Sequence, residues 1–327
     1  RIPRELLPIM GPRRVLAVLL NAKRLNFDQR LDLSNLKAVA TVEQHDVSYS
    51  AESILERVRG QEIVITKEMP LSSDVIMRFP DSVKLIVEAG TGYNNIALEA
   101  AASRQITVCN CPAYSTHAMA ELVLTSILNF SCSMLQQQRM LWDSQRSHFH
   151  DVEANIGSLP HFELGGKTLG LIGGSGTIGS RVATLASVFG MRVVVSSRSG
   201  RAPPGATCLP LDELLRTSDF VSIHAPLNDE TRGMLDAEKL ALLKPTAYLI
   251  NTARGAIVDE VALIDALRRR SFAGAALDVQ DPEPPPPGSP LYELDNLILT
   301  PHIGWRKIET RQRLMEMVTD NVCAYVE

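Results

Sequence analysis

The sequence is poor in cysteine, and its cysteines form no metal or disulfide pattern. The five cysteines lie scattered at positions 109, 111, 132, 208 and 323. Cys109 and Cys111 are closer together than a C-x₂-C zinc motif requires, and no histidine–cysteine cluster accompanies them. An odd number of cysteines does not suit a disulfide framework. We therefore expect free thiols in a reducing compartment, a cytoplasmic location and no bound metal.

Long hydrophobic runs and an excess of charge are also missing. No apolar run reaches the length that spans a bilayer. The net charge of −4 gives no reason to expect nucleic acid or an anionic membrane as a partner. The apolar fraction of 45% with 21% charged residues is ordinary for a globular protein. Because 327 residues are too many for one compact core, two domains are expected.

The chain does contain a glycine-rich turn near its middle, in the stretch KTLGLIGGSGTIGSRVA (167–183). An apolar run at 168–172 predicts a buried strand, and a helix is expected to begin at Thr177. Gly174, Gly176 and Gly179 satisfy G-x-G-x-x-G, in which the glycines permit a tight turn, close approach to a pyrophosphate and helix–strand packing. The helix N-terminus attracts phosphate. A glycine-rich turn in another α/β protein is the alternative. We assign cofactor binding to Gly174, Ser175, Gly176, Thr177, Ile178 and Gly179.

Short apolar runs alternate with helical patterns on both sides of this turn. Before it, strands are expected at 15–20, 36–42, 62–66, 83–88 and 106–109, with helices at 50–59, 72–79 and 95–104. A long apolar helix over 117–140 and a polar arm over 141–162 follow. After the arm, strands are expected at 169–172, 192–196, 220–224, 247–251, 274–277 and 297–300, with the clearest helices at 236–243 and 259–269. Such alternation predicts the α/β class, with two Rossmann-like domains built on parallel sheets.

The position of the turn predicts the domain organisation. A cofactor domain would span 112–301, so residues 1–111 must form a domain of their own. The last helix has Met315, Val318 and Val322 on one face and is too short to stand alone. We expect residues 302–327 to pack on the first domain, which then binds the substrate. The segment DPEPPPPGSP (281–290) is predicted to be stiff and extended, so it would hold a functional residue rigidly.

Six further motifs make the interpretation specific. They are EAGTGYNNI (88–96), CPAYSTHAMAE (111–121), HAPLNDET (224–231), INTARGAIVDE (250–260), ALDVQDPEP (276–284) and LTPHIGW (299–305). In this order the chain resembles the D-isomer-specific 2-hydroxyacid dehydrogenases from about residue 60 onward, nearest the glyoxylate and hydroxypyruvate reductases and glycerate dehydrogenases. The resemblance implies hydride transfer between a nicotinamide cofactor and a small 2-keto acid, with the active site in the interdomain cleft. It also implies a homodimer, joined through the helix and arm at 117–162.

Three residues carry the expected catalysis. Arg254 follows a buried strand, and its guanidinium can hold a carboxylate by two hydrogen bonds and polarise the adjacent carbonyl. His302 follows another strand, and imidazole suits proton transfer near neutral pH. Glu283 can pair with this ring, favour its protonated form and fix its orientation. The resemblance assigns the same three roles. Taken singly, a salt-bridged arginine, a solvated glutamate and a structural histidine remain the alternatives.

Other positions receive roles from the resemblance. The loop of Ala89, Gly90, Thr91 and Gly92 is expected to hold the substrate carboxylate through backbone N–H groups, and an ordinary turn is the alternative. Asp278 is expected near the nicotinamide carboxamide. We assign His224 to the strand end rather than to the chemistry. The residues expected to line the cofactor groove are Ala225, Pro226, Thr252 and Ala253.

Two departures from the family pattern concern the cofactor. Gly173 precedes the complete glycine motif, so the turn has one extra residue. Where an acidic residue is expected to bind the ribose of NAD, the chain has Ser197, with Arg198 beside it. Loss of the carboxylate removes the repulsion of a 2′-phosphate, and the guanidinium can bind that phosphate. The sequence therefore predicts NADP(H) as the cofactor, with NAD(H) possible as a second one.

Two rival functions are compatible with the same motifs. One is a ligand-sensing corepressor with this fold, which can keep the catalytic residues while it binds peptides. The other is a formate- or phosphite-type dehydrogenase, and the formate type has glutamine where this chain has Glu283. Oxidation of reduced cofactor in the presence of different 2-keto acids separates these functions.

Overall fold

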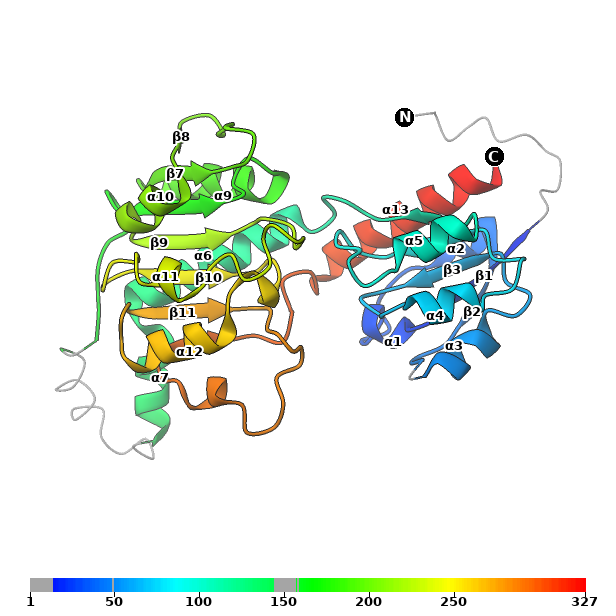
Figure 1. Cartoon of the computed structure of the whole chain (residues 1–327), viewed down its shortest axis with the longest axis horizontal. Coiled ribbons are helices and arrows are strands. Elements are labelled where there is room, and N and C mark those ends of the chain that lie inside the picture. Colours follow the sequence, from blue (N-terminus) through cyan, green and yellow to red (C-terminus); the bar gives the residue numbers. More distant parts are fainter. Residues whose placement is uncertain (1–13, 49, 144–156, 158) are drawn as a thin grey trace. The chain divides into compact units, whose positions relative to one another are not determined.

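The fold consists of two compact α/β units (Figure 1). It is described from a computed structural model that covers every residue except 1–13, 49, 144–156 and 158. Unit 1 comprises Arg1–Tyr114 with Arg306–Glu327, and unit 2 comprises Ser115–Trp305. Every strand pair in the described residues is parallel, which confirms the predicted fold class.

Unit 1 contains a five-stranded sheet in the order β2-β1-β3-β4-β5, counted over its described residues. Its strands are β1 (Val15–Leu19), β2 (Ala40–Gln44), β3 (Ile63–Thr66), β4 (Leu85–Glu88) and β5 (Thr107–Cys109). Its helices are α1 (Ala22–Leu25), α2 (Ser34–Val39), α3 (Ala51–Arg57), α4 (Ser73–Met77), α5 (Leu98–Ser103) and α13 (Ile308–Val326). Residues of α3, α4 and α5 form one core with the sheet. Helix α13 packs on α2 and β4 with Val318 and Val322 buried, so unit 1 is discontinuous in sequence.

Unit 2 contains a seven-stranded sheet in the order β12-β11-β10-β9-β6-β7-β8, over the part of it that the structure describes. Its strands are β6 (Thr168–Ile172), β7 (Arg192–Ser196), β8 (Thr207–Cys208), β9 (Phe220–Ile223), β10 (Tyr248–Asn251), β11 (Gly274–Leu277) and β12 (Leu297–Leu299). Its α-helices are α6 (Thr116–Cys132), α7 (Met134–Asp143), α9 (Thr177–Val188), α10 (Leu211–Thr217), α11 (Ala237–Leu240) and α12 (Glu260–Arg268). Two short 3₁₀ helices span Gly255–Ile257 and Pro290–Glu293.

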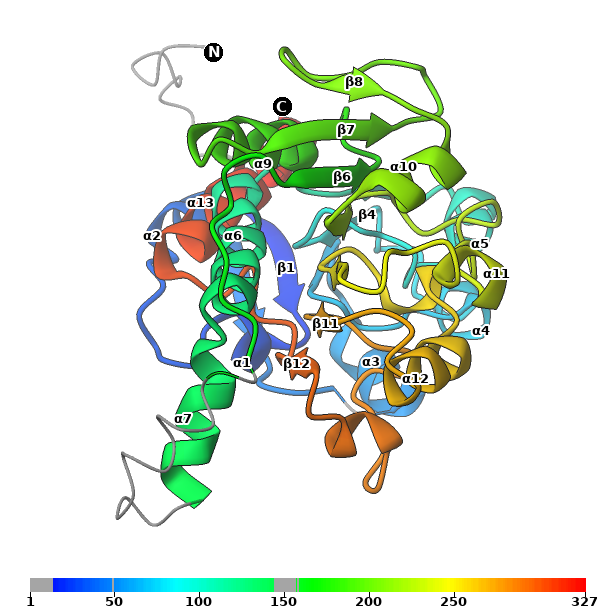
Figure 2. The same cartoon turned by 90° about the vertical axis from the view of Figure 1, so that its left-hand side faces the viewer.

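Helices cover both faces of the unit 2 sheet (Figure 2). Residues of α6 and α9 form one core with the sheet, which includes Leu169, Leu171 and Val195. Residues of α10, α11 and α12 form the second core on the opposite face, with Ile172 and Val194. Burial on both faces explains why β6 reads as a continuous apolar run rather than an alternating one.

Two predicted elements were wrong. The expected strand at 36–42 begins as helix α2, because Asp32 Oδ1 accepts from Ser34 N at 2.8 Å and satisfies a helix-start donor; the strand is β2. The expected single helix at 117–140 breaks at Ser133, which has φ +50° and ends α6. Asn129 Oδ1 accepts from Leu135 N at 3.0 Å, and Ser133 Oγ donates to Pro160 O at 2.6 Å, so side chains hold the break.

No single helix among the described residues is long and apolar enough to cross a membrane. The helices α6 and α7 meet that criterion only when taken together, and they are bent by 63° at their junction. Much of the arm predicted at 141–162 lies outside the described residues, since 144–156 and 158 are not among them. The part that is described begins with the end of α7.

Candidate functional site

Most of the predicted site residues in unit 2 lie where strands of its sheet end. In a parallel sheet all carboxyl ends lie at the same edge, which is where α/β proteins bind ligands. The structure therefore brings together, at that edge, loops that are far apart in sequence. They follow β6, β7, β9, β10, β11 and β12, and they carry Gly174, Ser197, Ala225, Thr252, Asp278 and His302 respectively.

The glycine-rich turn between β6 and α9 has no room for side chains at its base. A Cβ on Gly173 would lie 2.7 Å from Ala225 N, and one on Gly174 would lie 2.6 Å from Leu171 Cβ. On Gly179 it would lie 2.5 Å from Gly174 Cα, so the third glycine allows the helix to contact the turn. At Gly176, the residue before α9, the nearest atom would be 3.5 Å away. The described residues thus fit a backbone cradle for the phosphates of a dinucleotide.

The extra residue changes which glycine makes the turn. Gly173 has φ +76°, in the left-handed region, and Gly176 N donates to Gly173 O at 3.2 Å. The tight-turn role that the sequence assigned to Gly174 therefore belongs to Gly173, because Gly174 has no positive φ and packs against Leu171 and Val195 instead. The signal for this was the additional glycine in the sequence.

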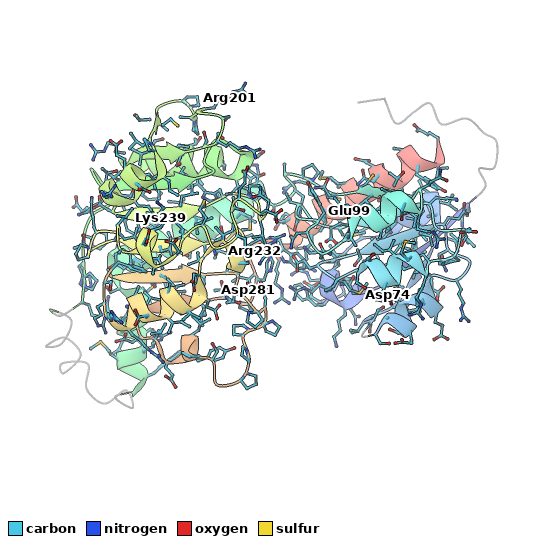
Figure 3. The ribbon with its side chains drawn as sticks, viewed as in Figure 1. Asp74, Glu99, Arg201, Arg232, Lys239 and Asp281 are labelled. Atoms are coloured by element: carbon cyan, nitrogen blue, oxygen red, sulfur yellow. The ribbon has the colours of Figure 1, made fainter. Side chains whose placement is uncertain are left out.

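The loop after β7 carries the residues expected to select the cofactor. Ser197 Oγ donates to Arg201 O at 2.7 Å, so the hydroxyl hydrogen is used in a hydrogen bond within the loop. Arg198 Nη1 lies 3.3 Å from Glu230 Oε2, and the two side chains are 85% and 72% exposed. An exposed ion pair of this kind contributes little free energy. Arg201 lies between β7 and β8 at the periphery of unit 2 (Figure 3).

The turn that presents Arg254 is held by a residue that the sequence analysis did not assign. Asn251, at the buried end of β10, donates from Nδ2 to Arg254 O at 2.9 Å. Its Oδ1 accepts from Ala253 N at 3.0 Å. Arg254 Nη1 donates to Ala253 O at 2.7 Å. The next residue, Gly255, touches the chain that leads to Glu283, because a Cβ there would lie 2.1 Å from both Gln280 C and Gln280 O.

His302 and Glu283 form a direct pair. His302 Nδ1 lies 2.7 Å from Glu283 Oε1, and the side chains are 13% and 30% exposed. His302 itself adopts φ +51°, a conformation that costs a non-glycine residue free energy. Its N–H donates to both Asp278 O and Thr300 O at 3.0 Å, which holds the strained residue in place.

Asp278 organises this histidine turn. Its Oδ1 accepts from Thr300 Oγ1 at 2.6 Å and from Ile303 N at 2.8 Å, and its Oδ2 accepts from Gly304 N at 2.9 Å. Burial raises the pKa of the Asp278 carboxyl, while these hydrogen bonds favour its ionised form. The sequence predicted Asp278 beside the nicotinamide, and in unit 2 its carboxylate accepts hydrogen bonds from the turn that carries His302.

In unit 1, two of the four backbone N–H groups in the predicted carboxylate-binding loop already donate hydrogen bonds within the fold. Ala89 N donates to Thr66 O at 2.7 Å, and Gly90 N donates to Glu88 O at 2.8 Å. Among the described residues, the N–H groups of Thr91 and Gly92 donate no hydrogen bond. Thr91 O accepts from Asn110 Nδ2 at 2.7 Å, which fixes the orientation of the loop. The expectation of four available donors was wrong for Ala89 and Gly90.

His224 has a structural environment. Burial lowers its pKa to about 4, so the ring is neutral at physiological pH. His224 Nε2 lies 3.0 Å from Ser222 Oγ. The backbone of His224 and Ala225 lies against Gly173, which places this strand end directly beside the glycine-rich turn.

Comparisons with known proteins give a consistent result. A family model described as D-isomer specific 2-hydroxyacid dehydrogenase, NAD binding domain, matches residues 128–304. The glyoxylate reductase of Aeropyrum pernix is 36% identical to this chain over 285 residues, which cover 84% of this chain and 83% of the relative. The glycerate dehydrogenase of Methylorubrum extorquens is 33% identical over 289 residues, covering 86% and 88%.

A solved structure extends the similarity to the fold. It is an NADPH-dependent glyoxylate/hydroxypyruvate reductase from Sinorhizobium meliloti, in complex with NADP and malonate. Its TM-score to this chain is 0.80 at 26% sequence identity, and the match covers 95% of this chain and 93% of that one. The similarity thus extends over both units.

Proposed function

The chain belongs to the D-isomer specific 2-hydroxyacid dehydrogenase family, and from that membership we propose that it reduces glyoxylate, hydroxypyruvate or a similar small 2-keto acid with NADPH. It is an enzyme with 2-hydroxyacid dehydrogenase activity and a nicotinamide dinucleotide cofactor. The corepressor hypothesis is therefore set aside. The choice of substrate and the preference for NADPH are the proposed parts.

One observation supports the proposed catalysis most strongly, namely the 2.7 Å pair of His302 Nδ1 and Glu283 Oε1. A carboxylate on one ring nitrogen fixes the orientation of the imidazole and favours its protonated form. The strained backbone at His302 is held by Asp278, whose carboxylate accepts three hydrogen bonds from the same turn. The loops that follow β11 and β12 thus cooperate to present one ring, which is the arrangement expected of a general acid.

The roles of the residues follow from their chemistry. Arg254 holds the carboxylate of the 2-keto acid and polarises the neighbouring carbonyl. Because Glu283 occupies Nδ1, we assign the proton transfer to Nε2 of His302, which protonates the carbonyl oxygen as it becomes a hydroxyl. When bound, the reduced nicotinamide supplies the hydride for the carbonyl carbon. The residues that would hold the cofactor are those of the glycine-rich turn, with Ser197, Arg198, Ala225, Pro226, Thr252, Ala253 and Asp278.

The same proposal assigns roles to the two parts of the chain. We assign dinucleotide binding to unit 2 (Ser115–Trp305) and substrate binding to unit 1 (Arg1–Tyr114 with Arg306–Glu327). The sequence had predicted these domains at 112–301 and at 1–111 with 302–327, so His302 lies in the dinucleotide-binding unit instead. In unit 1, the N–H groups of Thr91 and Gly92 are the two donors of the loop that a substrate carboxylate can use. A homodimer and a cytoplasmic location complete the proposal.

The preference for NADPH is supported by the loop after β7. No carboxylate stands at Ser197, so a 2′-phosphate meets no repulsion there. Arg198 is exposed and paired only with exposed Glu230 in the described contacts, so a phosphate can compete for its guanidinium. The Sinorhizobium meliloti reductase, with which this chain shares its fold, is itself NADPH-dependent. The remaining alternative is an enzyme that accepts both cofactors.

The test is oxidation of NADPH and NADH by the purified protein with glyoxylate, hydroxypyruvate and pyruvate. We expect turnover that depends on the 2-keto acid and a higher kcat/KM with NADPH. His302→Ala should abolish most of it, and His161→Ala, which truncates an exposed histidine of the same unit, should not. Absence of turnover with every 2-keto acid would refute the proposed function, and a preference for NADH would refute the cofactor assignment alone.

A further inference from the structure

Three ionisable side chains are buried in unit 1 beside the Ala89–Gly92 loop. Lys67 follows β3 and is 2% exposed, Glu88 ends β4 and is 0% exposed, and Tyr114 is 3% exposed. Lysine and glutamate are almost never fully buried unless they are paired, because removing a charge from water costs free energy. The catalytic roles assigned above use none of these side chains. Their burial therefore needs an explanation of its own.

The three side chains form a connected network. Lys67 Nζ pairs with Glu68 Oε1 and lies 3.5 Å from the hydroxyl of Tyr114. Glu88 Oε1 accepts from Glu68 N at 2.9 Å, and Glu88 Oε2 accepts from Asn95 Nδ2 at 2.9 Å. Every member is thus held in one orientation by hydrogen bonds.

This network lies directly against the loop that we propose binds the substrate carboxylate. A Cβ on Gly90 would be 3.0 Å from Glu88 Oε1 and 3.3 Å from Lys67 Nζ. A side chain at position 90 would therefore press on the two charged groups and require them to shift, so the glycine lets the loop lie against them. Gly90 O accepts from Cys111 N at 2.8 Å, which fixes the loop over them.

The charge of the network depends on Glu88. Burial opposes protonation of Lys67, but the negative groups around it outweigh burial and raise its pKa, so the ammonium stays charged. Burial raises the pKa of Glu88 to about 7. Burial also raises the pKa of Cys111 to about 12 and that of Tyr114, so both stay neutral. The titratable groups that interact with Glu88 are Lys67, Glu68, Cys111 and Tyr114. Arg24 pairs with Glu68, and Arg313 donates to the backbone oxygen of Tyr114.

We propose that Lys67 and Glu88 are positioning residues that set the affinity of the Ala89–Gly92 loop for the substrate carboxylate. This inference rests on the proposed function. Lys67 supplies a fixed positive charge behind the loop, and Glu88 diminishes it when ionised. When Glu88 is neutral, one negative charge fewer lies beside Lys67, and more of the lysine's positive charge acts on the loop. When Glu88 is ionised, its carboxylate offsets part of that charge, and an incoming carboxylate is bound more weakly.

The first test replaces the cation. Lys67→Met keeps the length of the side chain and removes its charge, so KM for glyoxylate should rise roughly tenfold or more. KM for NADPH should stay unchanged and kcat should change far less, because the lysine does not touch the reacting atoms. Lys84→Met, at an exposed position just before β4, is the matched control and should leave both KM values unchanged. An unchanged KM for glyoxylate in folded Lys67→Met would overturn the proposal.

The second test removes the titration and does not depend on the stability of the lysine variant. The inhibition constant of oxamate, a 2-keto acid analogue that is not reduced, is measured from pH 5.5 to 8.5 in wild type and Glu88→Gln. Below pH about 7 wild-type Glu88 is neutral, so the two proteins should bind oxamate alike. Above pH about 7 the wild type should bind oxamate more weakly than Glu88→Gln, and the ratio of the two inhibition constants should increase with pH. A pH-independent ratio of the two constants would overturn the proposal.

Failure of this inference is distinguishable from failure of the proposed function. If the wild type reduces no 2-keto acid, the proposed function is wrong. If the wild type reduces glyoxylate normally and both variants bind glyoxylate and oxamate like the wild type, only the role of Lys67 and Glu88 is wrong.

Discussion

Substitution of Gly255 by alanine tests whether the Arg254 turn and the Glu283 segment are in contact. A Cβ at this position would lie 2.1 Å from Gln280 C and O and 2.7 Å from Asp281 N. Ordinary van der Waals contacts of a Cβ are 3.4–4 Å, so one of the two backbones must move by more than 1 Å. Side-chain rotation cannot relieve the clash, because the atoms involved belong to the main chain. The movement must displace Arg254, Glu283 or both.

The size of the effect follows from the clash. Overpacking of a well-packed site costs about 1–3 kcal/mol of stability, and more when backbone must shift. A displacement of about 1 Å at a catalytic group reduces turnover by roughly 10²-fold. We therefore expect Gly255→Ala to lower kcat for glyoxylate by about two orders of magnitude and to lower the melting temperature.

The assay compares kcat, KM for NADPH and thermal unfolding of Gly255→Ala with those of Gly165→Ala. Gly165 is the matched control, because a Cβ there meets no atom within 4 Å and the residue has no positive φ. The control should behave like the wild type. A Gly255→Ala variant with wild-type turnover and stability would show that the two segments are not in contact, and the reasoning about their geometry would be refuted.

Four further variants test individual roles. Arg254→Ala should raise KM for glyoxylate and lower kcat together, since the charge serves both bound substrate and transition state; loss of only one of them would contradict this. Glu283→Gln should lower kcat and leave KM for NADPH unchanged, because the carboxylate orients His302 and does not hold the cofactor; an unchanged kcat would exclude it from the mechanism. Ser197→Asp/Arg198→Ala should shift kcat/KM toward NADH by roughly tenfold to a hundredfold, the worth of one charge-assisted hydrogen bond, and no shift would refute the cofactor assignment. Glu230→Gln should release Arg198 and lower KM for NADPH but not for NADH, and equal effects on both would contradict the competition.

The fold was predictable where a local pattern determines the element. Apolar runs such as 168–172 form strands because they are buried on both faces. The glycine motif correctly predicted the turn and the start of helix α9. The break at Ser133 was not predictable, since the serine adopts φ +50° only with support from Asn129 and Pro160, which tertiary contacts supply. Likewise, α2 begins beside the Asp32 carboxylate and packs on α13, which lies far along the chain, so the local sequence did not reveal it.

The sequence motifs were enough to identify the catalytic residues. They were not enough to predict roles that depend on which hydrogen bonds a side chain makes in the folded chain. The Arg254, Glu283 and His302 assignments came from motif order and chemistry. The role of Asp278 in the His302 turn required knowing that its two oxygens face Ile303 and Gly304. Lys67 and Glu88 received no role in the sequence analysis, although Glu88 begins one of its motifs, because nothing in runs such as VITKEMP or EAGTGYNNI indicates that the charged side chain is buried.

The central claim is that His302 transfers a proton during reduction and does not serve to bind the cofactor. Its most direct test is a single-turnover experiment in which NADPH-loaded wild type and His302→Ala are mixed with saturating glyoxylate. The account predicts that the rate of NADPH oxidation falls by roughly 10²–10⁴-fold in the variant, while the dissociation constant for NADPH, measured by titration, stays unchanged. A variant that oxidises NADPH at the wild-type rate, or that loses activity only because it no longer binds NADPH, would contradict the claim.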